Sequence, residues 1–369
     1  MSMRCPTCGT MYGDEARFCT RDGTRLTAPP GAAAAPAAAP GAAPGAAPGA
    51  PAASSAPTKP AAPAQPARAT AVRPKEAAAG TTGASSHANM AGKVLDRRYH
   101  IVRKVGEGGM SYVYLAHDVA SQERYAIKIL SPALSKDENA MARLRREAAL
   151  GIRLAHPNVC HIVRMGETED GIVYVVMPYV EGEILSDRNY RVGKTTLTDA
   201  AKFVTEIADG LHVAHQLTII HRDLKPENIM ICKRADGTEY AVVMDFGLAK
   251  ERKAGGELQK LTATGIILGT PEFMSPEQLR GKTLDLRTDV YSLALMVYEM
   301  LTGKLPFEGK NQQEMMISRL RNDPIPAKNR RPELPDAVDA VLLKAMARAP
   351  EDRYQSAPDF AKAFRDAAG

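Results

Sequence analysis

Three short runs between residues 99 and 130 carry the clearest hydrophobic pattern of the chain. Residues 99–105, 112–118 and 124–130 are rich in Val, Ile and Tyr, and turn-like residues separate them. Runs of this length and composition predict three β-strands that pair antiparallel. In the third run, alternation places Ala126 and Lys128 on one face of the strand and three apolar side chains on the other.

Beyond the third strand the spacing of apolar residues lengthens to that of a helix. Residues 138–154 carry apolar side chains at helical intervals, at Met141, Leu144, Ala148 and Ile152. This spacing predicts an amphipathic helix. A very apolar stretch at 289–301 predicts a second, more deeply buried helix, and residues 172–177 read as a further strand.

Residues 28–90 follow neither pattern. They consist mostly of Ala, Pro and Gly, with the unit Ala-Ala-Pro-Gly repeated near residues 38–49. Frequent Pro removes hydrogen-bond donors and obstructs each helical turn that Ala would favour. We therefore expect a disordered, partly polyproline-like linker, whose fully extended length approaches about 200 Å at roughly 3.1 Å per residue.

Composition and charge narrow the class of protein. With 369 residues and 44% hydrophobic content, the chain exceeds one typical domain and holds enough apolar residues for a sizeable core. Of the net charge of +6, residues 1–27 supply +1 and the linker +3, which leaves +2 for residues 91–369. So thin a basic excess argues against nucleic acid as a partner. The sequence shows no transmembrane run and no signal peptide, so we expect a cytoplasmic protein.

Three of the five cysteines stand within the first nineteen residues. Cys5 and Cys8 form a Cys-x-x-Cys knuckle followed by Gly9, and Cys19 opens a similar shape in which Asp22 stands where a fourth cysteine would be. The pairing resembles a zinc ribbon, so residues 1–27 are expected to bind Zn²⁺ through Cys5, Cys8 and Cys19, with Asp22 as a weaker fourth ligand. A redox-active or unfolded Cys-x-x-Cys tail is the alternative, and a nucleic-acid-binding module that localises the protein is another.

Two further features suggest phosphate chemistry. The turn between the first two strands contains Gly106, Gly108 and Gly109, which let backbone amides approach phosphate oxygens, although glycine-rich hairpins are common. Lys128 is a lone cation on an apolar strand and needs a partner, for which Glu147 on the following helix is the candidate. The alternatives are a solvated edge lysine and an ordinary surface glutamate.

The stretch His-Arg-Asp-Leu-Lys-Pro-Glu-Asn at 221–228 places a carboxylate, an ammonium and a carboxamide on one short loop. Asp223, Lys225 and Asn228 can together serve an incoming hydroxyl, a phosphate and a metal ion. Groups of these three kinds are what the transfer of a phosphoryl group requires.

The ordered set of motifs resembles the signature of protein kinases over about residues 95–365. It consists of the glycine-rich loop, Ala-x-Lys, the helix glutamate, the octet at 221–228, Asp-Phe-Gly at 245–247 and Ser-Pro-Glu at 275–277. The nearest resemblance is to the eukaryotic-like serine/threonine kinases of bacteria. It implies an α+β fold of two lobes within residues 91–369: a β-rich N-lobe at about 95–177 and a helical C-lobe at about 181–365.

The resemblance also implies a role for each matching residue. Lys128 should contact the α- and β-phosphates of ATP with Glu147 fixing it, Asp223 should orient the acceptor hydroxyl and take its proton, and Lys225 should balance charge on the transferred phosphate. Mg²⁺ or Mn²⁺ ions should be held by Asn228 and Asp245. The nucleotide should be enclosed by Val105, Gly106, Gly108, Gly109, Ser111, Val113, Ala126, Lys128, Met177 and Val180.

Further implications concern the acceptor and regulation. Lys225 and Thr270 favour serine or threonine over tyrosine as the acceptor in protein substrates. Arg222 marks kinases whose activation segment is ordered by a phosphate, so we expect autophosphorylation at Thr262 or Thr264, for which self-association would allow transfer in trans. The alternative for Thr262 and Thr264 is a merely polar loop.

Structural supports are implied as well: Asp289 should tie back to the catalytic loop, and Glu277 should pair with Arg353. Cys160 and Cys232 lack companions in a metal-ligand pattern and are expected to be packed thiols. Residues 186–198 match no clear element. A pseudokinase scaffold that binds nucleotide without transferring phosphate is the alternative function.

Overall fold

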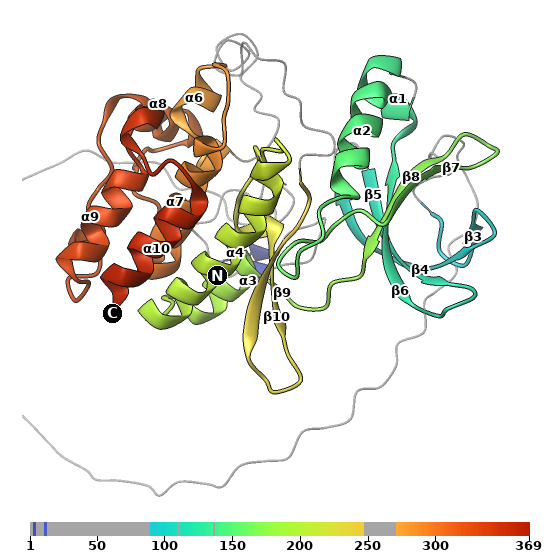
Figure 1. Ribbon diagram of the computed structural model, residues 1–369, viewed down its shortest axis with the longest axis horizontal. Coiled ribbons are helices and arrows are strands. Elements are labelled where there is room, and N and C mark those ends of the chain that lie inside the picture. Colours follow the sequence, from blue (N-terminus) through green and yellow to red (C-terminus); the bar gives the residue numbers. More distant parts are fainter. Residues whose placement is uncertain (1–2, 5–10, 13–88, 109–110, 136, 247–270) are drawn as a thin grey trace, which may run out of the picture. The chain divides into compact units, whose positions relative to one another are not determined.

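The computed structural model describes residues 3–4, 11–12, 89–108, 111–135, 137–246 and 271–369 (Figure 1). The chain divides into two compact units, Met1–Ala78 and Ala79–Gly369. In the first unit, strands β1 (Met3–Arg4) and β2 (Met11–Tyr12) pair antiparallel. The described residues do not include the predicted zinc ligands, Gly109 or the predicted phosphosites Thr262 and Thr264. They include only the last two residues of the predicted linker.

A six-stranded sheet forms the N-terminal lobe of the second unit. Its strand order is β3-β4-β5-β6-β8-β7, and every neighbouring pair is antiparallel. The three strands predicted from the Val-, Ile- and Tyr-rich runs are confirmed as β4, β5 and β6. The bounds are β3 Val94–Leu95, β4 Tyr99–Gly108, β5 Ser111–Asp118, β6 Arg124–Leu130, β7 Arg164–Glu167 and β8 Val173–Pro178.

Strand β6 divides its side chains between two faces, as its alternation predicted, and the structure shows apolar residues of both faces packed in core clusters. Ala126 packs in a core cluster with helix α2, whereas Ile127 and Ile129 pack on the opposite side of the sheet. Met90, which the sequence placed at the end of the linker, is buried in that second cluster. The chain is therefore already part of the folded lobe at this residue.

Helix α2 (Glu138–Gly151) follows the short helix α1 (Pro132–Ser135). The Asp137 carboxylate accepts a hydrogen bond from the Ala140 amide and so caps its N-terminus. The helix ends three residues before the predicted Leu154. At Gly151 a Cβ atom would lie 2.7 Å from Ile162 Cδ1, so the close approach of the next segment requires glycine there.

The C-terminal lobe is helical and is built around α7, of which nearly every residue is buried. The predicted apolar helix is thereby confirmed, two residues longer at its start and one at its end. Residues 186–198, in which no element was predicted, form most of α3 and the start of α4. The bounds are α3 Leu185–Val192, α4 Leu197–Gln216, α6 Pro276–Leu279, α7 Arg287–Thr302, α8 Gln312–Arg321, α9 Asp336–Ala345 and α10 Ala357–Ala368, with 3-10 turns at η2 Pro226–Asn228, η3 Pro271–Phe273, η4 Ala327–Asn329 and η5 Pro350–Asp352.

A small sheet of order β11-β10-β9 lies in the C-terminal lobe, with bounds β9 Glu183–Ile184, β10 Ile229–Lys233 and β11 Glu239–Val243. Strands β10 and β11 form an antiparallel hairpin. The loop before β10 and the residues after β11 therefore meet at the same end of the hairpin. Among the described residues, no helix has both the length and the apolar character needed to cross a bilayer.

Candidate active site

The β10–β11 hairpin brings two of the predicted motifs together. Ile229 lies opposite Val243 in the register, and just beyond this pair the Met244 amide donates a 2.8 Å hydrogen bond to the Asn228 carbonyl. His221 Nε2 also donates to the Met244 carbonyl at 2.9 Å. The loop at 221–228 and Asp245 are thus fixed beside each other by backbone groups.

Three polar side chains of this loop converge as the sequence predicted. Asn228 Nδ2 donates to the Asp223 carbonyl at 2.7 Å and to Asp223 Oδ2 at 3.1 Å. Lys225 Nζ lies 3.7 Å from the same Oδ2 atom. One carboxylate oxygen of Asp223 therefore has both an amide donor and a positive charge beside it.

Lys128 connects the N-terminal lobe to this loop system. Its Nζ atom lies 3.1 Å from Asp245 Oδ1, and the two side chains are 15% and 44% exposed. Asp245 has a left-handed backbone, with φ of 50°, which is uncommon for a residue other than glycine. Asp245 is therefore one partner of Lys128, and the predicted ion pair with Glu147 stays a prediction.

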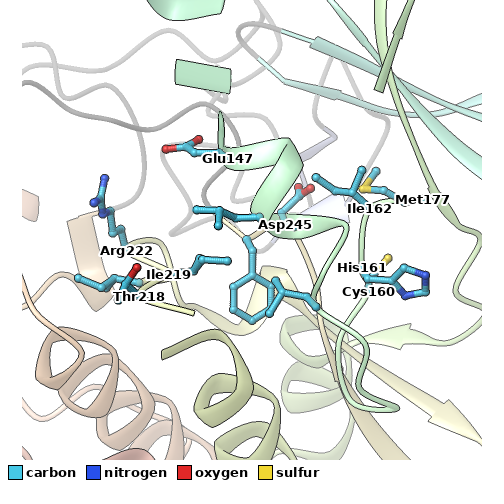
Figure 2. A pocket seen from close by; sticks show the side chains of 14 residues that line it. Glu147, Cys160, His161, Ile162, Met177, Thr218, Ile219, Arg222 and Asp245 are labelled. Carbon is cyan, nitrogen blue, oxygen red and sulfur yellow. The ribbon is translucent and has the colours of Figure 1, made fainter. Parts of the chain in front are cut away.

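A cavity of about 140 Å³ lies next to these groups and is shown in Figure 2. Its walls come from α2, from the segment at 160–162, from Met177, from residues 218–222 and from Asp245 and Phe246. Glu147 and Asp245 both line it, so the structure brings the predicted helix glutamate to the same enclosed space as the predicted metal ligand.

The thiol of Cys160 lines the same cavity. Burial raises its pKa to about 12, and its Sγ lies 3.7 Å from the Pro178 carbonyl, which accepts a weak hydrogen bond. Cys232 is also buried with its thiol free, and burial raises its pKa. The prediction of two packed thiols is confirmed.

Asp289 fixes the start of the loop at 221–228 through hydrogen bonds. Its Oδ2 atom accepts hydrogen bonds from the His221 amide and from His215 Nε2, both at 2.8 Å, and Oδ1 accepts from the Arg222 amide at 3.0 Å. The predicted tie to the loop is confirmed. His215, at the end of α4, was missed, because nothing in its local sequence distinguishes it from a helix-terminal histidine.

The predicted pair of Glu277 and Arg353 is also confirmed. The guanidinium donates two 2.8 Å hydrogen bonds to the carboxylate, and Thr288 Oγ1 adds a third at 2.9 Å. Burial would raise the pKa of Glu277, but the hydrogen bonds and charge of Arg353 outweigh it and hold the pKa below its ordinary value. The carboxylate is thus kept ionised in the core.

The residues predicted to enclose a nucleotide lie in or next to strands β4, β5, β6 and β8 of the N-terminal lobe, as far as the structure describes them. Ala126 pairs with Met177 across β6 and β8, and both are buried. Gly106 lies opposite Val113 in the β4–β5 hairpin, and Val105 next to it is 38% exposed. The register also pairs Gly108 with Ser111, and Val180 follows β8 by two residues.

Residues 99–363 match the family model described as protein kinase domain. The chain is 36% identical over 271 residues to serine/threonine-protein kinase pkn3 of Myxococcus xanthus, covering 73% of this chain and 50% of that protein. It is 40% identical over 268 residues to serine/threonine-protein kinase PknB of Mycobacterium tuberculosis, covering 72% and 42%. The chain thus spans about half or less of these relatives.

Among solved structures, the PknI kinase domain of Mycobacterium tuberculosis matches with a TM-score of 0.58 and 28% identity, over 75% of this chain and 99% of that one. Rad53 bound to AMP-PNP matches with a TM-score of 0.59 at 23% identity, which supports the fold alone. These likenesses cover both lobes described above.

Proposed function

This chain belongs to the protein kinase domain family, and we propose that it transfers the γ-phosphoryl group of ATP to serine or threonine hydroxyls of proteins. The observation that carries the proposal is the convergence of Asp223, Lys225 and Asn228 on one loop, beside the ion pair of Lys128 with Asp245. These are the groups that a phosphoryl transfer needs.

Asp223 would orient the acceptor hydroxyl and accept its proton. Its Oδ2 atom is tied to Asn228, which fixes the direction of the carboxylate before a substrate arrives. Lys225, 3.7 Å away, would move its positive charge from Asp223 to the transferred phosphoryl group as negative charge develops there. The presence of Lys225 supports serine or threonine as the acceptor.

The residues present fit the divalent ions that this family uses. Asn228 commits its amide nitrogen to Asp223, which turns its amide oxygen, the atom that Mg²⁺ prefers, away from that carboxylate. The Asp245 carboxylate is 44% exposed beside it. We propose that Asn228 and Asp245 hold Mg²⁺ or Mn²⁺, which would neutralise phosphate charge when bound.

Lys128 would contact the α- and β-phosphates of ATP, with Glu147 as its support. Its distance of 3.1 Å from Asp245 supports this role, because Asp245 is one of the residues that would hold the metal ions beside the phosphates. Adenine would pack between Val105, Val113, Ala126 and Met177 and would reach the backbone of Val180, with the glycine-rich turn and Ser111 over the phosphates. The carbonyl of Pro178 would accept from adenine beside the weak bond from Cys160.

The test is an assay of the full-length chain with ATP, Mg²⁺ and a generic protein acceptor. Asp223→Asn should abolish transfer while nucleotide binding persists. The control is Asp366→Asn. Asp366 is an exposed residue, and its described ion pair is with Lys362 of the same helix. Nucleotide binding without transfer by the unmodified chain would support a pseudokinase scaffold instead.

For residues 1–27 we propose a Zn²⁺ site formed by Cys5, Cys8 and Cys19, with Asp22 as the fourth ligand. In support, β1 and β2 pair so that Arg4 lies opposite Met11, and a hairpin with this register has the Cys-x-x-Cys stretch between its strands. Native mass spectrometry of the full chain at neutral pH should find one zinc ion that Cys5→Ser with Cys8→Ser removes. A zinc-free chain would reject the site.

We further propose that Thr262 or Thr264 is autophosphorylated, in trans between two copies of the chain. Arg222 immediately before Asp223 supports this, because its guanidinium can pair with a phosphate of the activation segment. Replacing both threonines by Ala should remove the phosphate found by mass spectrometry and lower activity. Mixing an inactive Asp223→Asn chain with the active one should transfer phosphate to the inactive chain.

A further inference from the structure

The peptide bond between Arg222 and Asp223 is held at both of its polar atoms. Its carbonyl oxygen accepts a 2.6 Å hydrogen bond from Gln278 Nε2. Its N–H donates to the His221 carbonyl at 2.8 Å and lies 3.4 Å from His221 Nδ1. Because a peptide unit is planar, fixing its oxygen and its nitrogen fixes the direction in which Asp223 leaves it.

The residue before this bond needs such support. Arg222 has φ of 63°, in the left-handed region that is strained for a residue with a Cβ atom. Asp289 holds the amide of Arg222, and Gln278 holds its carbonyl. The two hydrogen bonds hold the backbone of Arg222 at its amide and at its carbonyl. Without the bond from Gln278, the backbone of Arg222 can relax toward a negative φ and turn Asp223 away.

Gln278 uses both ends of its carboxamide. Its Oε1 accepts a 2.9 Å hydrogen bond from the Ser275 amide, and Ser275 Oγ accepts at 3.3 Å from the Gln278 amide, which together form a capping box at the start of α6. Its Nε2 is the donor to Arg222. A glutamate at this position would keep the capping acceptor but would lose the donor and place a negative charge against the Arg222 carbonyl.

The segment that carries Gln278 is itself rigidly anchored. Arg319 is 1% exposed. Its Nη1 atom donates hydrogen bonds to two carbonyls of this segment, those of Pro271 at 2.9 Å and Met274 at 2.8 Å. Ser292 Oγ donates to the Phe273 carbonyl at 2.8 Å, and Glu277 is locked to Arg353. Gln278 therefore transmits the position of a fixed element to the loop rather than following the loop.

We infer that Gln278 is a positioning residue for Asp223, which couples the anchored end of the activation segment to the orientation of the proton acceptor. The inference rests on the phosphotransfer proposed above. It predicts a selective loss: Gln278 bonds Ser275 and Arg222 rather than the residues proposed to hold ATP, so the main effect falls on the alignment of Asp223 with the acceptor hydroxyl. A misplacement of about 1 Å in such a geometry reduces turnover by up to about 100-fold.

Two variants of the full chain separate the bridge from the cap. Gln278→Glu keeps the capping box and removes the bond to Arg222, so kcat should fall about 10- to 100-fold with the KM for ATP and the Tm nearly unchanged. Ser275→Ala removes the cap and keeps the bond, so the Tm should fall while kcat stays within about threefold. Gln278→Met, which lacks both polar ends, should show both losses and serves if the glutamate variant does not fold.

Amide hydrogen exchange over residues 219–228 gives a second readout that does not need activity. Gln278→Glu should speed exchange in this loop, and Ser275→Ala should not. Unchanged kcat and unchanged exchange in Gln278→Glu would overturn the inference, as would a loss that merely parallels the fall in Tm. If the unmodified chain transfers no phosphate, the proposed function fails, and the exchange experiment still decides whether Gln278 holds the loop.

Discussion

The carboxylate of Glu277 and the guanidinium of Arg353 form a bidentate pair whose side chains are 6% and 0% exposed, with both hydrogen bonds 2.8 Å long. The guanidinium also donates to the carbonyls of Ala347 and Arg287 and lies over the ring of Tyr291, 4.7 Å from its centre. Through this pair the end of the activation segment is joined to the segment between α9 and α10.

Breaking the pair from one side should strongly destabilise the fold. Arg353→Met leaves the Glu277 carboxylate buried without its counter-ion, which should lower the free energy of unfolding by about 3–5 kcal/mol. Urea denaturation measures the change. Lys362→Met, which removes one member of an exposed pair with Asp366, should cost less than about 0.5 kcal/mol, and a similar loss in both variants would contradict the role given to Glu277.

The pKa of Glu299, raised by burial to about 7, predicts a pH dependence of stability. The ordinary pKa of a glutamate, as in an unfolded chain, is 4.5, so between pH 4.5 and 7 the folded state holds a proton that the unfolded state has released. Stability therefore falls as the pH rises through this range.

Glu299→Gln should remove this contribution while keeping the hydrogen bond from Asn189 Nδ2. The variant should be more stable than the unmodified chain at pH 8, by on the order of 2 kcal/mol, and nearly equal to it at pH 4.5. Thermal unfolding followed across this range checks the prediction. An equal effect at both pH values would show that Glu299 does not titrate in this way.

Asp289 should matter for turnover as well as for stability. Asp289→Asn keeps one acceptor oxygen but faces an NH₂ group toward amides that need an acceptor, so at least one of its three hydrogen bonds is lost. Unsatisfied buried donors should lower stability by about 1–3 kcal/mol, and kcat should fall at least tenfold because the loop carrying Asp223 loosens. Steady-state kinetics and Tm together test this, and a stable variant with full kcat would refute it.

Cys160 should be chemically inert in the folded protein. With a pKa of about 12, only about one thiol in ten thousand is ionised at pH 8, and the side chain is buried. Mass spectrometry after brief treatment with iodoacetamide should find Cys160 unmodified in the native chain and alkylated in urea. Rapid labelling of the native chain would mean that the cavity next to it opens readily.

Several features were determined by the sequence because they depend on neighbouring residues. The run at 124–130 defined β6 and the assignment of its residues to two faces, and the apolar spacing after residue 138 defined α2. Phosphate chemistry, the tie of Asp289 and the pair of Glu277 with Arg353 came from an ordered set of motifs rather than from any single one. The pattern Ser-x-x-Gln at 275–278 could also have indicated the capping box.

Only the tertiary structure decided which distant groups meet. The sequence assigned Glu147 to Lys128, and the structure adds Asp245, 117 residues away along the chain, at 3.1 Å from that ammonium. It also brought Ile162 from the next segment against Gly151, the last residue of α2, and it turned Gln278 toward Arg222. Local periodicity fixes which residues lie on a face, but the choice among distant partners depends on how the packed elements bring those faces together, and no local pattern encodes that.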